Sequence, residues 1–253
     1  MGFEFYSDNS KESISVYYDF FLVVNKYVEL TYHGDKKRLE AAQMAAKEVM
    51  DKLMKLAEQK KSVRNTFNET AGLLAEQTKK GVEAVSTHKL AADVENFLTQ
   101  GKGVLDLLAN KLFKELVGYV GKFNHKNIIK HLREQLDLDQ SVVNEIEVLL
   151  NRDWDIWLKS FVDDRNLHHE ENIKISKMSY MNGQPIVFFE RRDGNKFGNL
   201  DEFVNTHWNN LMGLISDLIW LVFASKLQIF KTVRVTRDMF ISPDSPDYEK
   251  PNS

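Results

Sequence analysis

Apolar residues recur every three or four positions through most of the first 170 residues, which is the spacing of one face of an α-helix. The longest stripe predicts a helix over residues 36–80, ~60 Å long, that breaks near Gly81. Nine of its eleven positions are apolar, which is typical of a coiled-coil seam. The stripe consists of Leu39, Ala42, Ala46, Val49, Leu53, Leu56, Lys60, Val63, Phe67, Thr70 and Leu74.

A second stripe predicts the helix that returns antiparallel to the first, which makes a long helical hairpin. It consists of Leu90, Val94, Phe97, Leu105, Leu108, Leu112 and Leu116. Before the hairpin, the aromatic and aliphatic residues 13–32 predict a further helix that stops near Gly34.

A third helix is predicted to begin at a capping residue, Asp139 or Ser141. Its inward face follows the steps 3, 4, 4, 3, 4, 4 and 3. That face reads Val143, Ile146, Leu150, Trp154, Trp157, Phe161, Arg165 and His168, with Asn166 and His169 beside it. An apolar stripe therefore runs into an arginine and two histidines.

The period then changes to that of β-strands. Residues 173–191 contain two β-prone runs around Asn182-Gly183, a strong hairpin signal because both residues accept positive φ. Asn199 is predicted to cap a last helix, whose stripe is Val204, Trp208, Leu211, Ile215, Leu218 and Val222. On the same helix, Trp208, Trp220 and Phe223 are predicted core residues, some of which could instead form a dimer face.

The expected fold class is mainly α: a helical bundle with a long antiparallel helical hairpin and one inserted β-hairpin. We expect a single domain over residues 10–240 and a disordered tail over residues 241–253, where three of the four prolines lie.

The composition of the chain excludes several kinds of site and partner. The 253-residue chain has no cysteine, which excludes disulfides and thiolate metal sites. Its net charge of −3 does not suggest a general nucleic-acid binder. The N-terminal residues lack the pattern of a signal peptide, and the longest apolar run, 211–224, is too short for a membrane span. We expect a cytoplasmic protein with no membrane partner and no cofactor.

Residues alone leave three interpretations of the Arg/His cluster open. In the first, Arg165, His168 and His169 lie at a helix C-terminus, where cations meet the negative end of the helix dipole, and pair with Asp163 or Asp164. In the second, they belong to a metal site, because imidazole and carboxylate groups bind zinc or iron. Its ligands would be Asp164, His168, Glu171 and His207. The chain lacks the repeated Glu-x-x-His of di-iron bundles.

The third interpretation is a site that acts on RNA. Arg165-Asn166 followed by His168 and His169 resembles the signature of HEPN domains, helical bundles found in bacterial toxin and phage-defence systems. Residues 97–113 also resemble an earlier helix of that family, and the resemblance covers roughly residues 90–225. It implies a metal-independent endoribonuclease, commonly a homodimer, in which His deprotonates a ribose 2′-OH and Arg stabilises the phosphate. The interval between Arg165 and the histidines is shorter than in the family, so RNA binding without cleavage stays open.

Five basic residues lie on or beside the predicted hairpin: Lys174, Lys177, Arg191, Arg192 and Lys196. They are candidate RNA-binding residues, because cations positioned along a surface hold phosphates. The alternative is an ordinary edge strand, on which lysines prevent aggregation. A different class of function also stays open: a non-enzymatic scaffold whose long helices bind a protein partner.

We expect the purified protein to carry no stoichiometric transition metal, because it has neither thiolates nor a repeated Glu-x-x-His. Elemental analysis tests this prediction. About one zinc or iron per chain would contradict it and would identify Asp164, His168 and His207 as the first ligands to mutate.

Overall fold

The computed structural model describes residues 24–81, 85, 87–162, 173–181, 183–191, 196–197 and 199–227; for several strand residues it describes the backbone only. The chain divides into two compact units. Unit 1 comprises Met1–Met54, Leu105–Asn151 and Ile215–Ser253, and unit 2 comprises Lys55–Val104 and Arg152–Leu214. Each of the four boundaries between the units falls within a helix. The expected single domain over residues 10–240 therefore stays a prediction.

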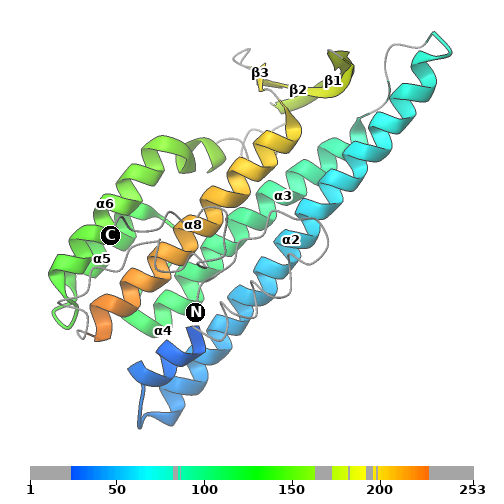
Figure 1. Ribbon diagram of the computed structural model, residues 1–253. Helices are drawn as coiled ribbons and strands as arrows, with labels where there is room; N and C mark the ends of the chain where they lie inside the picture. Colours follow the sequence, from blue (N-terminus) through cyan, green and yellow to red (C-terminus); the bar gives the residue numbers. More distant parts are fainter. Residues whose placement is uncertain are drawn as a thin grey trace, which may run out of the picture. The chain divides into compact units, whose positions relative to one another are not determined.

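Helix α2, Lys36–Thr78, is one continuous helix of 43 residues (Figure 1). It follows a helical segment at residues 24–31 and a turn in which Gly34 has a φ of 92°. Nine of the eleven predicted stripe residues are buried, and only Leu39 and Lys60 are partly exposed. The predicted seam is confirmed, and the chain leaves the helix just before Gly81, whose φ is 80°.

The return helix begins as α3, His88–Leu107, continues as the π-helical turn η1, Leu108–Phe113, and ends as α4, Lys114–Val117. Every residue of its predicted stripe is buried. Within unit 2, Lys89 pairs with Glu69 of α2 at 3.0 Å. Within unit 1, Lys111 pairs with Glu48 at 3.1 Å. Rising numbers on one helix meet falling numbers on the other, so the pair is antiparallel, as predicted.

A polar contact interrupts the apolar seam in unit 2. Asp93 of α3 accepts a hydrogen bond from the buried Thr66 hydroxyl at 2.6 Å and another from the Gln59 amide at 3.3 Å. A buried polar group has to be hydrogen-bonded, so this contact favours one register of α2 against α3.

Unit 1 also contains α5, His125–Glu134, and α6, Gln140–Asp153. The Asn124 side chain accepts a hydrogen bond from the Asn127 amide at 3.1 Å and caps α5. Asp139 accepts from the Ser141 amide at 3.0 Å, so Asp139 rather than Ser141 caps α6. The buried aromatic residues of α8 belong to this unit as well: Trp220 and Phe223 pack on Tyr27 at 5.0 and 5.3 Å between ring centroids. Both are core residues, as predicted.

The predicted inward face of the third helix needs one correction. A π-helical turn, η2, spans Trp154–Leu158, and residues 159–162 are α-helical again. A π-turn takes one extra residue per turn and rotates the positions that follow. Just before this turn Asp153 is buried, and Trp154 at its start is only partly buried, whereas Trp157 and Phe161 are buried as predicted.

The predicted hairpin is confirmed. Strand β1, Ile173–Met181, pairs antiparallel with β2, Gln184–Arg191, around a turn in which Gly183 has a φ of 76° (Figure 1). The sheet also has a third strand that the pattern did not predict, β3, Lys196–Phe197, which pairs with the end of β2. Two residues are too few to show a period.

A β-bulge in β1 explains why two of its residues that are three positions apart are both buried. The register shifts between Ile175 and Lys177, and Ile175 and Met178 are both buried. Strict alternation would put residues three apart on opposite faces, and a bulge returns them to one face.

Helix α8, Leu200–Leu227, completes the described chain. Asn199 caps it as predicted, by accepting a hydrogen bond from the Asp201 amide at 2.8 Å. The predicted stripe is buried except at Trp208, which is partly exposed and lies under the Lys60 ammonium, 5.0 Å from the ring centroid. Residues 241–253, the predicted tail, lie outside the described residues.

The close approach of helices in unit 2 generates a prediction about Gly101. A Cβ at this position would lie 2.7 Å from Cζ of Phe161, whose ring is fully buried. Gly101→Ala should lower the free energy of unfolding by ~1–2 kcal/mol, because overpacking outweighs the gain in helix propensity. Gly72→Ala is the matched control, since nothing lies within 4 Å of its Cβ, and it should stabilise by ~0.5–1 kcal/mol. Equal shifts in urea denaturation would contradict the packing argument.

Candidate functional site

The central part of the predicted site lies outside the described residues. Arg165, Asn166, His168 and His169 all fall within residues 163–172, between Val162 of the helix and Ile173 of β1. The two other metal-ligand candidates of that segment, Asp164 and Glu171, fall there too, and so do the proposed partners Asp163 and Asp164 of the helix-end interpretation. The structure describes the residues of unit 2 from which this segment starts and to which it returns.

The helix that leads into the segment is held by aromatic packing. The rings of Trp157 and Phe161 are both buried, and their centroids are 5.9 Å apart. Phe161 lies against Gly101 of α3 and, through its ring, against α8. The last described turn before Arg165 is therefore fixed in the core of unit 2.

His207 of α8 belongs to this aromatic cluster. It is 8% exposed, and its ring centroid lies 5.2 Å from that of Phe161 and 4.4 Å from that of Phe203. Phe203 and His207 are four residues apart, so they lie on the same helix face. This spacing could have identified the pair from sequence, but His207 was considered only as a metal ligand.

The described residues do not bring a metal-ligand set together around His207. Across the described parts of residues 24–162 and 173–227, no group of three or more His, Asp and Glu side chains could hold a metal ion. The interpretation that combines His207 with Asp164, His168 and Glu171 depends on residues that are not described, and the expected absence of a metal stays a prediction.

The far end of the segment is also attached within unit 2. The Thr87 hydroxyl, just before α3, donates a hydrogen bond to the Ile175 carbonyl at 3.2 Å. Ile175 is buried as well. Residues 163–172 thus form a ten-residue connection between a helix and a strand that are each fixed by packing or hydrogen bonding.

The basic residues of the hairpin occupy defined register positions. Lys174 on β1 is opposite Glu190 on β2, and Glu190 is opposite Lys196 on β3. Lys177 pairs with Phe188, Arg191 pairs with Ile173, and Arg192 lies outside the described residues. The predicted basic cluster therefore includes an acidic residue, Glu190, between Lys174 and Lys196. This neighbourhood follows from the pairing of the strands and cannot be seen in the sequence.

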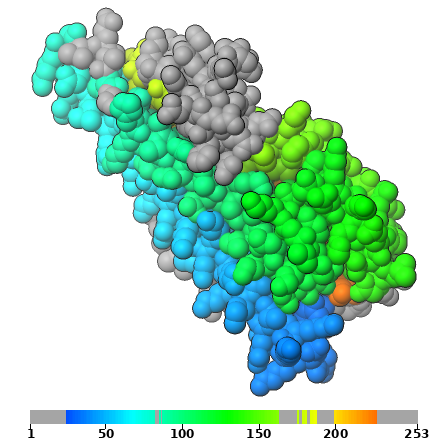
Figure 2. Space-filling view, turned by 180° about the vertical axis from the view of Figure 1, so that it is seen from behind, coloured from blue at the N-terminus to red at the C-terminus, as the bar shows by residue number. Residues whose placement is uncertain are grey.

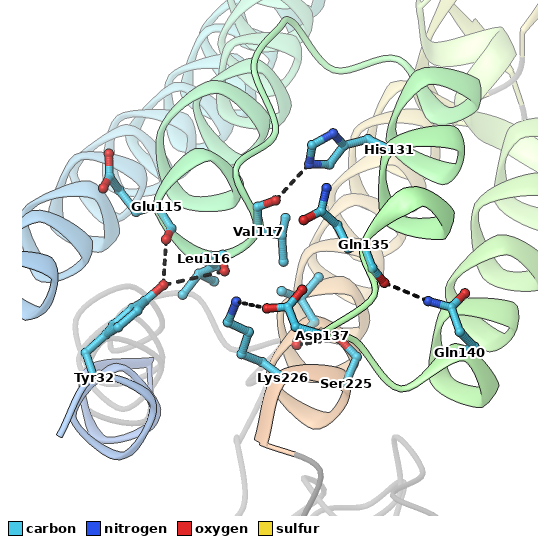
Figure 3. Close-up of polar contacts among 11 residues, drawn as sticks. Tyr32, Glu115, Leu116, Val117, His131, Gln135, Asp137, Gln140, Ser225 and Lys226 are labelled. Carbon is cyan, nitrogen blue, oxygen red and sulfur yellow. Dashed lines mark hydrogen bonds and ion pairs between the residues drawn. The ribbon is translucent and has the colours of Figure 1, made fainter.

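A second polar cluster lies in unit 1 (Figure 3). The Tyr32 hydroxyl donates to the Glu115 carbonyl at 2.5 Å, and Nε2 of His131 donates to the Val117 carbonyl at 2.7 Å. Both carbonyls lie at the end of α4, where a helix leaves acceptors without intrahelical partners. Burial raises the pKa of Tyr32, so its hydroxyl remains a donor at neutral pH. These groups stabilise a helix end, and we assign them no catalytic role.

The same cluster joins α8 to the loop before α6. The Asp139 amide donates to the Ser225 carbonyl at 3.1 Å, and Nζ of Lys226 donates to Asp137 at 2.8 Å (Figure 3). The hydrogen bond from Lys226 lowers the pKa of Asp137. Lys226 and Asp137 are 89 residues apart in the sequence, so no local pattern predicts their contact.

No family model, no curated protein and no solved structure matches this chain. Among the helices that the structure describes, none has the length and apolar character required to cross a membrane.

The Asp137–Lys226 pair predicts a pH dependence of stability. Because the folded pKa of Asp137 is below its unfolded value, the pair stabilises the protein above about pH 4, and this contribution disappears as pH falls through the folded pKa. Lys226→Met should lower the free energy of unfolding near neutral pH by less than ~1 kcal/mol, because Asp137 is largely exposed. Urea denaturation should show this deficit shrinking toward pH 2. Lys47→Met, an exposed lysine on α2, is the control, and a pH-independent deficit would contradict the assignment.

Proposed function

We propose that this chain is an HEPN-like protein that acts on RNA through the segment 163–172. The observation that carries the proposal is the buried aromatic helix that the structure describes as far as Val162, three residues before Arg165. Its aromatic face is packed inside a mainly helical unit as far as Phe161, and ten residues separate Val162 from the first strand of the β-hairpin. This is the setting that the resemblance to HEPN domains implies for the Arg/His motif.

Helical phase supports the choice of residues. Phe161 is fully buried in the last described turn. If the helix continues, Arg165 comes one turn later on the same face, and His168 comes one turn after that. An arginine beside an aromatic core is costly to bury without acceptors, so a site that receives phosphate groups is a suitable environment for it.

The proposed chemistry needs only the chain's own groups. His168 or His169 removes the proton from a ribose 2′-OH, whose oxygen then attacks the adjacent phosphorus. Arg165 stabilises the negative charge that develops on the phosphate oxygens, and Asn166 helps to hold the substrate. The bond from phosphorus to the 5′-oxygen breaks, and that oxygen takes up a proton. The products are a 2′,3′-cyclic phosphate and a 5′-hydroxyl. Cations of the hairpin would hold flanking phosphates, and two subunits could share the site.

A second candidate function has its own observation. Helix α2 exposes large apolar side chains outside its buried seam: Met44 is 65% exposed in unit 1, and Leu73 is 55% exposed in unit 2. Exposed apolar residues on a long helix are suited to a protein partner. In this alternative the chain is a non-enzymatic scaffold, and Arg165 is a structural residue that pairs with Asp163 or Asp164.

The two functions predict different effects of the same substitutions. If the RNA function is correct, Arg165→Ala and His168→Ala should each reduce RNA cleavage or binding at least about 100-fold, with nearly unchanged melting temperatures. Cleavage is measured on a labelled single-stranded RNA in the presence of EDTA, and the 2′,3′-cyclic phosphate is detected by mass spectrometry.

The controls use exposed residues of the same types, Arg38→Ala and His88→Ala, which should leave RNA activity intact. If Arg165 is structural, Arg165→Ala should instead lower the melting temperature by roughly 4–8 °C, because an acidic partner loses its cation. Wild-type protein that neither binds nor cleaves RNA would exclude the proposed function.

A further inference from the structure

Helix α5 carries a row of cations on its exposed side. Lys126, Lys130 and Arg133 follow one another at i, i+4 and i+7, and Lys122 precedes the helix. All four are exposed. We call these four residues the α5 basic face. Lys126 and Arg133 are separated by a rise of ~10 Å along the helix axis.

The opposite side of α5 is buried in the core of unit 1. Ile128, Ile129 and Leu132 are buried, and His125 at the start of the helix is buried too. The orientation of the helix is therefore fixed, and the α5 basic face always points away from the core.

Polar contacts hold both ends of α5 in place. The Asn124 side chain caps its N-terminus, and His131 donates to the Val117 carbonyl. Beyond the last turn, the Gln140 amide donates to the Gln135 carbonyl at 2.9 Å (Figure 3). The cations are consequently presented by a rigid element, which reduces the entropy lost when they bind a ligand.

The charge of this region contrasts with that of the whole chain. Residues 118–134 contain these four cations and a single acidic residue, Glu134, whereas the chain has a net charge of −3. Arg133 pairs with Glu147. Among the described residues, Lys122, Lys126 and Lys130 take part in no ion pair. In Figure 2 the green segment that carries α5 lies on the visible face of the molecule.

We propose that the α5 basic face binds the phosphate backbone of RNA. This inference rests on the proposed function and adds a second contact surface for the same substrate class, separate from the hairpin cations. Lysines spaced along a helix neutralise successive phosphates and release their counterions, which gives affinity without sequence preference. Asn127, exposed between them, can donate to phosphate oxygens.

The packing of α5 favours RNA over an anionic membrane. A helix that binds a membrane surface inserts its apolar face into the lipid. The apolar face of α5 is already buried in unit 1, so only the charged side is available. Such a surface fits a flexible polyanion that needs no apolar insertion.

The test compares two double variants of the full-length chain that remove the same charge. Lys126→Gln/Lys130→Gln removes two cations of the α5 basic face, and Lys37→Gln/Lys47→Gln removes two exposed lysines of α2. Binding to a fluorescein-labelled single-stranded RNA is followed by anisotropy from low to moderate salt. The α5 variant should raise Kd about tenfold and lower the slope of log K against log salt by ~1.4. The α2 variant should have little effect.

Two further measurements separate the possible outcomes. Lys126→Arg/Lys130→Arg, which keeps the charge, should bind like wild type, and equal melting temperatures show that the variants fold. Co-sedimentation with vesicles of phosphatidylcholine and phosphatidylserine tests lipid binding. Vesicle binding that is lost in the α5 Gln variant, with RNA affinity unchanged, would overturn the proposal in favour of a membrane.

The proposal and the function on which it rests fail differently. If Arg165→Ala abolishes cleavage while the α5 and α2 Gln variants bind RNA alike, the α5 basic face is wrong and the RNA function stands. If the wild-type chain binds RNA without cleaving it, and binding weakens only in the α5 Gln variant, the α5 basic face is supported as an RNA-binding surface. The proposed cleavage by the Arg165 site is then wrong. A wild-type chain that does not bind RNA overturns both.

Discussion

The buried seam of α2 is the constraint on which the rest of the structure depends. From Ala42 to Leu74 the helix buries a residue at nearly every third or fourth position, and the return helix contacts it through Lys89 and Asp93 in unit 2 and through Lys111 in unit 1. A helix of this length is stable only if its apolar stripe is covered. A polar residue at a single seam position specifies the register of two packed helices. The hydrogen bonds that Asp93 accepts from Thr66 and Gln59 are such a contact, so polar groups favour the register that the apolar groups stabilise.

The regular parts of the fold could be predicted because they depend on local spacing. The two stripes of the helical hairpin, the caps Asp139 and Asn199, and the turn before Gly183 each follow from a few neighbouring residues. The π-turns could not be predicted, since a change from four to five residues per hydrogen-bonded turn leaves the composition unchanged. Trp154, which the spacing places on the inward face, is only partly buried at the start of η2. The two-residue strand β3 is too short for any periodic signal.

The candidate site was less accessible to sequence reasoning than the fold. The Arg/His motif is recognisable as a sequence of residue types, but its function depends on exposure and on partners that spacing does not supply. The contribution of Glu190 to the basic hairpin depends on pairing between strands, and the contacts of Tyr32 and Lys226 join residues more than eighty positions apart. By contrast, the α5 basic face has ordinary helical spacing.

The π-helical turn η2 has a consequence for how this protein can change over evolution. A π-turn corresponds to a single residue inserted into an α-helix. Deleting one residue within Trp154–Leu158 would remove this extra residue and restore uniform α-helical winding, while the residues on either side of the turn keep their orientation. Phe161 would then stay in contact with Gly101. A deletion in the regular α-helix before η2 would instead rotate every later position by ~100° about the helix axis. Within this helix, related chains are therefore expected to differ in length by one residue at η2 more readily than in the regular turns before it.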